Sequence, residues 1–104
     1  MLDNVVILKR ANRQFQSICD YLVDEFGESV ADAFESEVER CVTTLVKFPE
    51  AGHPEPIDSK YIYRSKIVGK HTKMYYFVRG NTLVIAAFAD MRMHPNKIMK
   101  IVKG

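Results

Sequence analysis

Apolar residues recur every three or four positions through the first half of the chain, which is the spacing of one face of an α-helix. This spacing predicts a first amphipathic helix with apolar positions at Phe15, Ile18, Cys19, Leu22, Val23 and Phe26. A second helix, which Pro49 ends, is predicted by the same spacing at Val30, Phe34, Val38, Cys41, Leu45 and Phe48. We expect both apolar faces to pack in the core.

The joint between these two helices is short and contains Gly27, which can adopt the left-handed backbone that ends a helix. Ser29 is expected to cap the second helix, with Asp32 three residues later completing a partial capping box. Because the joint is so short, the two helices should form an antiparallel hairpin.

The remaining segments are rich in strand-forming residues. Asn4–Leu8 is a short β-branched run that predicts a strand, and the proline-rich segment 49–60 predicts a loop. Three further strands are predicted at 61–68, 73–78 and 82–89, separated by a turn around Gly69 and by the two-residue hairpin Gly80-Asn81, which is typical of a type II′ turn. The last of these strands is apolar on both faces, which indicates a central strand covered on each side.

The order strand, helix, helix, strand, strand, strand predicts an α+β fold in which the helical hairpin packs on one face of an antiparallel β-meander. The first strand joins the same sheet, either at an edge or in the middle. A chain of 104 residues forms one domain, residues 1–104. Its 47% hydrophobic and 27% charged residues are ordinary for a soluble globular protein.

Several classes of partner are not expected from the composition. The longest apolar run, Leu83–Ala89, is far too short to cross a bilayer, and no apolar signal segment opens the chain, so we expect a cytoplasmic protein without a membrane partner. Cys19 and Cys41 are interpreted as reduced core thiols, with a disulfide between the helices as the alternative. Neither has a second Cys or His at metal-ligand spacing, so we expect no metal.

Cationic side chains mark defined points of the meander. Arg64 lies in its first strand, Lys70 and His71 lie in its first turn, and Arg92 and His94 follow its third strand. We expect Arg64, Arg92 and His94 to gather along a single edge of the sheet. The structural alternative is that Arg64 pairs with Asp90 or a helix glutamate, that Arg92 caps the strand end, and that His71 is merely solvated.

Four segments together resemble one known superfamily. They are FPEAG at 48–52, YR at 63–64, GKHTKMYYFV at 69–78 and FADMRMHP at 88–95. In this order and spacing the chain resembles, over nearly its whole length, the RelE/ParE superfamily of toxins from bacterial type II toxin–antitoxin systems. The resemblance implies a small cytoplasmic toxin that is neutralised by an antitoxin through an extended or helical segment.

The superfamily has two main activities. ParE-like members poison DNA gyrase, whereas RelE-like members cut mRNA on the ribosome. By resemblance, a ribonuclease would use Arg64 and Arg92 to contact phosphate and His94 to move a proton.

The formal net charge of +2 is weak for a protein that must hold ribosomal RNA. We therefore favour a gyrase poison, with the mRNA endoribonuclease as the alternative and an inactive antitoxin-binding homologue as the second alternative. The residues expected to bind target or antitoxin are Arg64, Lys70, His71, Arg92, His94, Lys97 and Lys100. No small-molecule cofactor is expected.

Overall fold

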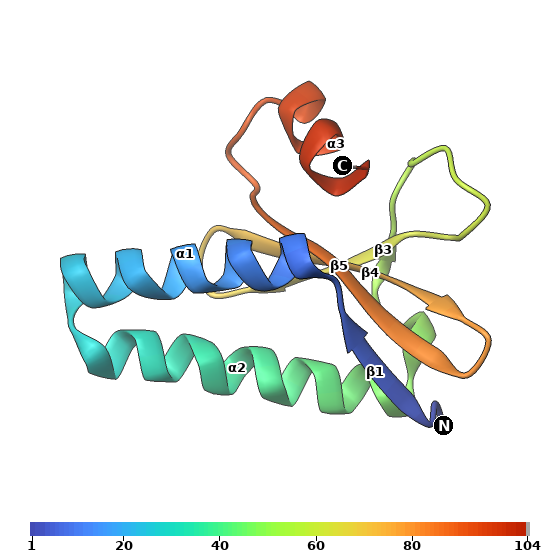
Figure 1. Ribbon diagram of the computed structural model, residues 1–104, viewed down its shortest axis with the longest axis horizontal. Helices are drawn as coiled ribbons and strands as arrows, with labels where there is room; N and C mark the ends of the chain where they lie inside the picture. The colour runs from blue at the N-terminus through green and yellow to red at the C-terminus, as the bar shows by residue number, and fades with distance from the viewer. Residues whose placement is uncertain (104) are drawn as a thin grey trace.

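The computed structural model describes residues 1–103 and contains one five-stranded sheet with helices on both faces (Figure 1). The first strand lies at an edge, where it runs parallel to the last strand, and the other pairs are antiparallel. In spatial order the strands are β1 (Asn4–Ile7), β5 (Thr82–Asp90), β4 (Thr72–Arg79), β3 (Arg64–Val68) and β2 (His53–Pro54). The predicted α+β architecture is confirmed, and the position of the first strand is now defined.

Two long helices form the predicted antiparallel hairpin, α1 (Lys9–Phe26) and α2 (Glu28–Lys47). Gly27 joins them alone, with a φ of +94° that side-chain-bearing residues rarely adopt. Since a single residue completes the joint, α2 restarts at Glu28, and Gly27 occupies the N-cap position without a side-chain hydrogen bond. The expectation that Ser29 caps α2 is therefore wrong, because Ser29 already lies inside the helix.

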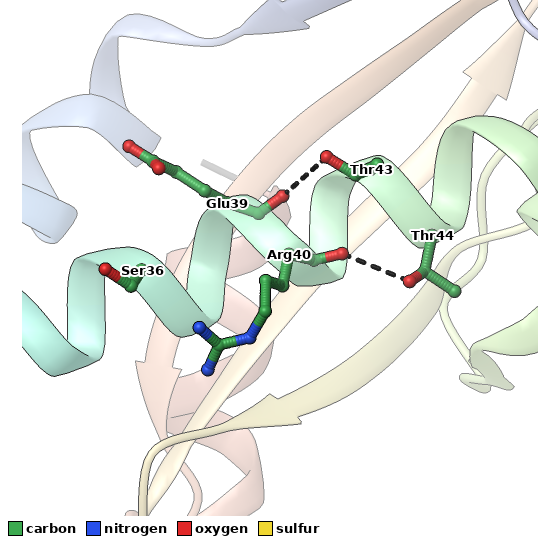
Figure 2. A pocket seen from close by; sticks show the side chains of 5 residues that line it. All are labelled: Ser36, Glu39, Arg40, Thr43 and Thr44. Carbon is green, nitrogen blue, oxygen red and sulfur yellow. Dashed lines mark hydrogen bonds between the residues drawn. The ribbon is translucent and has the colours of Figure 1, made fainter.

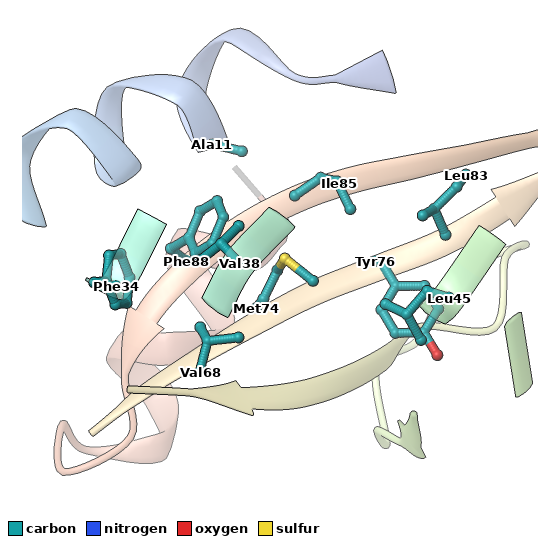
Figure 3. Close-up of a cluster of buried hydrophobic side chains, with 10 residues drawn as sticks. All are labelled: Ala11, Phe34, Val38, Leu45, Val68, Met74, Tyr76, Leu83, Ile85 and Phe88. Carbon is teal, nitrogen blue, oxygen red and sulfur yellow. The ribbon is translucent and has the colours of Figure 1, made fainter. Parts of the chain in front are cut away.

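One face of the sheet packs against this hairpin and forms the larger core (Figure 3). The buried side chains come from both helices and from three strands: Ala11, Phe34, Val38, Leu45, Val68, Met74, Tyr76, Leu83, Ile85 and Phe88. Each large apolar side chain removed from water in this way stabilises the fold by about 1.5–3 kcal/mol. This layer explains why apolar residues recur at helical spacing in the first half of the chain.

β5 is buried on both faces, as the sequence predicts for 82–89. A β-bulge changes its alternation, because Tyr75 pairs with Ala87 while Tyr76 pairs with Ile85, which leaves Ala86 as an extra residue. Ala86 and Ala87 consequently face the same side, and Phe88 turns toward the hairpin.

A third helix, α3 (Pro95–Lys103), covers the opposite face of the sheet. Val102 is buried there, and Ile98 and Ile101 pack beside it against the second core cluster. No helix is predicted for this segment from the apolar spacing. Pro95 at its first position is a helix-start signal that could have identified it.

Segment 49–60, expected to be a loop, contains a 3₁₀ turn η1 (Pro49–Ala51) and the two-residue strand β2. A proline is tolerated in β2 because this strand lies at the edge of the sheet. β3 begins at Arg64 rather than at residue 61, since Tyr61 and Tyr63 instead pack their rings on Phe77, with centroid separations of 4.5 and 5.1 Å.

The two turns of the meander follow the sequence prediction. Gly69 and Gly80 both have positive φ values, +69° and +59°. No residue other than glycine has positive φ among those described, so Gly80-Asn81 fits the type II′ geometry, which needs positive φ only at its first position. Cys19 and Cys41 are free and half-buried, as interpreted, and burial raises the pKa of both thiols.

Apolar positions near the two ends of the hairpin do not pack as expected. Val23, Phe26, Val30 and Phe48 are all exposed. The sheet ends beside Phe34, since a Cβ on Gly69 in the turn after β3 would lie 3.1 Å from the Phe34 ring. The distal part of the hairpin projects beyond the sheet (Figure 1). In the described part of the chain, none of the helices is long and apolar enough to span a membrane.

The turn at the end of α2 is held by side chains of β3 and β4. The Tyr76 hydroxyl accepts a hydrogen bond from the Gly52 N–H at 2.8 Å and donates one to the Pro49 carbonyl at 2.7 Å. Arg64 Nη1 donates to the carbonyls of Gly52 and Glu50 at 3.0 and 3.2 Å. Burial raises the pKa of Tyr76, so its hydroxyl keeps the proton that this arrangement needs.

Replacing Gly52 by alanine should destabilise the fold by about 1–3 kcal/mol, because the added Cβ would lie 2.3 Å from the Tyr76 hydroxyl oxygen. Tyr76→Phe should cost a similar amount, about 1–3 kcal/mol, since it leaves the buried Gly52 N–H without its acceptor. Urea unfolding measures both losses, and Ala51→Ser at the exposed neighbouring position is the control. An unchanged midpoint for Gly52→Ala would contradict this packing.

Candidate functional site

The turn between β3 and β4 lies beside the end of β5. Thr72 pairs with Asp90, and the Met91 N–H donates to the His71 carbonyl at 2.7 Å. Glu37 on α2 holds the same turn by accepting a hydrogen bond from the Gly69 N–H at 2.6 Å. Lys70, His71 and Arg92 are therefore brought to one end of the meander.

Arg92 is bound by the carboxylate of Asp90. Its Nε donates to Oδ1 at 3.0 Å and its Nη2 to Oδ2 at 2.7 Å, while its backbone N–H donates to Oδ1 at 2.8 Å. These bonds lower the pKa of Asp90 to about 2, with a smaller contribution from the nearby charge of His71. The Arg92 side chain is 65% exposed, so it remains accessible to a partner although Asp90 fixes its orientation.

His94 caps the N-terminus of α3. Its Nδ1 accepts a hydrogen bond from the Asn96 N–H at 3.1 Å, and its carbonyl accepts from the N–H groups of Lys97 and Ile98. Lys97 and Lys100 lie exposed on the helix that this cap begins.

Arg64 is separated from Arg92 and His94. Arg64 pairs with Tyr76, whereas Asp90 pairs with Thr72 and Thr72 with Val68 at the other end of β3. Four residues along a strand correspond to roughly 13 Å. The expected gathering of all three residues along one edge is therefore wrong for Arg64, whose guanidinium is used to hold the turn at Glu50 and Gly52.

The candidate catalytic groups are thus engaged in the fold itself. Arg64 binds two backbone carbonyls, Arg92 binds a carboxylate, and His94 Nδ1 caps a helix. RNA cleavage through a 2′-hydroxyl needs a base, an acid and a phosphate-binding cation that converge on one phosphate. The arrangement presents cationic groups on a surface and does not converge three of them on a point. Among residues 1–103, no three side chains of metal-binding type are grouped.

A groove between α1 and the C-terminal segment was not found from the sequence. It has a volume of about 470 Å³ and is lined by Arg10, Arg13, Gln14, Ser17, Ile18, Phe88, Ala89, Asp90, Met93 and Ile101. The Gln14 side-chain oxygen accepts a hydrogen bond from the Phe88 N–H at 2.9 Å. This bond ties α1 to β5 beneath the groove. The sequence signal was the spacing of Arg10, Arg13 and Ser17, which places them on one flank of a helix.

A second depression, of about 540 Å³, lies on the outer face of α2 (Figure 2). The hydroxyls of Thr43 and Thr44 donate to the carbonyls of Glu39 and Arg40 at 3.0 and 3.1 Å, within the helix itself. All four residues are exposed to solvent. This surface is a solvated helix face, and it serves below as a site for control substitutions.

The β-α-α-β-β-β core with its sheet order agrees with the architecture expected from the RelE/ParE resemblance. Residues 5–95 match the family model described as the ParE toxin of the type II toxin-antitoxin system, parDE, and the chain belongs to this family. Its fold is similar to that of a chain from the chromosomal ParDE TA system from P. aeruginosa, with a TM-score of 0.70 and 17% identity over 86% of this chain and 96% of that chain. Among curated proteins, no sequence matches it.

The ion pair of Arg92 and Asp90 predicts a specific titration. Since the folded pKa of Asp90, about 2, lies below the ordinary value of 3.8, the pair stabilises the fold above pH 3.8 and this contribution is lost as the pH falls toward 2. Arg92→Ala should raise the midpoint of the Asp90 carboxyl carbon, measured by NMR, toward 3.8. Lys97→Ala, which removes a cation not bonded to Asp90, should leave that midpoint unchanged. Equal midpoints in the wild-type chain and in Arg92→Ala would refute the pairing.

Proposed function

We propose that this chain is a ParE-like toxin that poisons DNA gyrase by binding to it, and that a cognate antitoxin neutralises it. Membership of the ParE family supports the toxin role. The observation that favours binding over cleavage is the internal engagement of Arg64, Arg92 and His94. Gyrase resides with the chromosome, so the proposed site of action is the cytoplasm.

The endoribonuclease alternative requires groups that this surface does not supply together. Arg64 lies roughly 13 Å along the sheet from the level of Asp90. Of the two arginines that the resemblance assigns to phosphate, Arg64 is thus separated from His94, and Arg92 is already bonded to Asp90. Stabilising a phosphorane dianion needs fixed cations that are not already compensated. The geometry therefore supports the binding toxin over the nuclease.

The proposed contact with gyrase is the cationic end of the meander together with α3. Lys70, His71, Arg92, Lys97 and Lys100 are all exposed. Exposed cations accelerate association with an acidic partner surface and fix its orientation more than they add affinity. Arg92 is the best-oriented of the five, because Asp90 holds its guanidinium in a fixed position. Arg64 and His94 contribute to this surface only through the segments that they position.

The proposed antitoxin covers apolar surface that the chain leaves open. Tyr21 and Phe26, near the distal end of the hairpin, are 58% and 61% exposed. At the opposite side, β1 presents a free edge with exposed Val5, Val6 and Ile7. Exposed apolar side chains and unpaired strand edges of this kind are normally covered by a partner, as an added strand or a packed helix.

The purified chain, freed of any antitoxin, should inhibit supercoiling by gyrase and increase the fraction of DNA trapped in cleavage complexes. Arg92→Glu should weaken this effect by at least about ten-fold, since it replaces an attraction by a repulsion at the interface. Arg40→Glu makes the same charge change on the outer face of α2 and should retain the wild-type effect within about two-fold.

The alternatives are tested with the same preparations. Unchanged supercoiling at excess wild-type chain would overturn the gyrase assignment. Cuts in mRNA at codon spacing, appearing only when ribosomes are present, would instead support the endoribonuclease. Normal growth of cells that produce the chain alone would identify an inactive antitoxin-binding homologue.

A further inference from the structure

We infer that the groove between α1 and the C-terminal segment is a docking slot for an extended antitoxin segment in which carboxylate and apolar side chains alternate. Arg10 and Arg13 form one side of this slot, and apolar side chains of α1, β5 and α3 form its floor. The inference rests on the proposed function, because it names a contact of the proposed antitoxin.

An unsatisfied donor lies at one end of the groove. The Arg10 side chain is half-buried, and its Nη2 donates to the Val102 carbonyl, which ties α1 to the end of α3. Its Nε–H is buried and has no acceptor among the described residues. A buried donor without a partner is unfavourable, so an acceptor that reaches it when a segment docks gains by satisfying it.

A second guanidinium lies one turn further along α1. Arg13 is exposed. The ion pairs found among residues 1–103 are Lys73–Glu55 and Arg92–Asp90. In that part of the chain, therefore, neither Arg10 nor Arg13 has a carboxylate partner. Asp90 also lines the groove, but Arg92 already binds both of its carboxylate oxygens. The slot therefore presents two uncompensated positive charges.

The floor of the groove determines the rest of the ligand. Ile18, Met93 and Ile101, which are half-buried, supply apolar surface between α1 and α3. A nucleic-acid backbone would satisfy the guanidinium groups but would leave this floor uncovered. A peptide that places carboxylates on the arginines and apolar side chains on the floor satisfies both, and an extended strand does so because its successive side chains point to opposite sides.

The place of the slot also explains how binding could neutralise the toxin. Asp90 and Met93 line the groove, and Arg92 lies between them in the sequence. Tyr21 lies four residues beyond Ser17, on the same flank of α1. A segment lying in the slot thus reaches the cationic surface proposed to contact gyrase.

The test measures the dissociation constant between the full chain and the purified antitoxin protein encoded beside its gene. Arg13→Glu should raise this constant by at least about ten-fold, since it removes a charge-assisted hydrogen bond and introduces repulsion. Arg13→Gln should produce a smaller rise. Arg40→Glu, the same charge change on the outer face of α2, should stay within about two-fold of the wild-type value. Arg10 itself is not substituted, because its hydrogen bond to the Val102 carbonyl supports the fold.

NMR of the ¹⁵N-labelled wild-type chain follows the Arg10 Nε–H directly, and this resonance should move downfield when the antitoxin binds. An Arg13→Glu constant equal to that of Arg40→Glu, or an unmoved Arg10 resonance in the complex, overturns the slot and leaves the gyrase assignment intact. If the wild-type chain binds the antitoxin through the slot but does not affect gyrase, the slot stands and the gyrase assignment is overturned. If the antitoxin does not bind the wild-type chain, both the slot and the proposed neutralisation fail.

Discussion

Burial of β5 between two apolar layers is the constraint on which the rest of this structure depends. Its hairpin side carries Leu83, Ile85 and Phe88, and its other side carries small residues under α3. A single extra residue at the bulge keeps both layers filled, because it turns Phe88 toward the hairpin while Ala86 and Ala87 share the opposite face. The strand also positions the proposed contact surface, since Asp90 ends β5 and binds Arg92.

Several charged side chains of this molecule position backbone segments. Arg64 holds the Pro49–Gly52 turn, Asp90 orients Arg92, and Glu55 accepts hydrogen bonds from Ser65 and Lys73 to fix segment 53–60 on β3. Groups engaged in this way keep a fixed place. The proposed action, binding through a charged surface that an antitoxin covers, depends on this fixed placement.

Periodicity alone was enough to predict the hairpin, the meander and the double burial of β5, because each is dictated by a local pattern of apolar residues. It failed where tertiary geometry decides. Val23, Phe26 and Val30 have the helical spacing of core residues, yet the sheet ends before reaching them. Likewise, the distance between Arg64 and Arg92 depends on which residues of the strands pair. The groove at Arg13 requires α3, whose nine residues are too few for the apolar spacing to predict a helix.

The central claim is that a cationic surface acts by binding gyrase. Covalent capture of the target in growing cells tests this claim most directly. A photoreactive amino acid placed at Lys97, exposed on α3 beside the cationic end of the meander, is activated by light after growth arrest begins. The account predicts one dominant covalent adduct that contains a gyrase subunit, and a much weaker one when the same amino acid stands at Arg40. An adduct with ribosomal protein or mRNA from position 97 would contradict it.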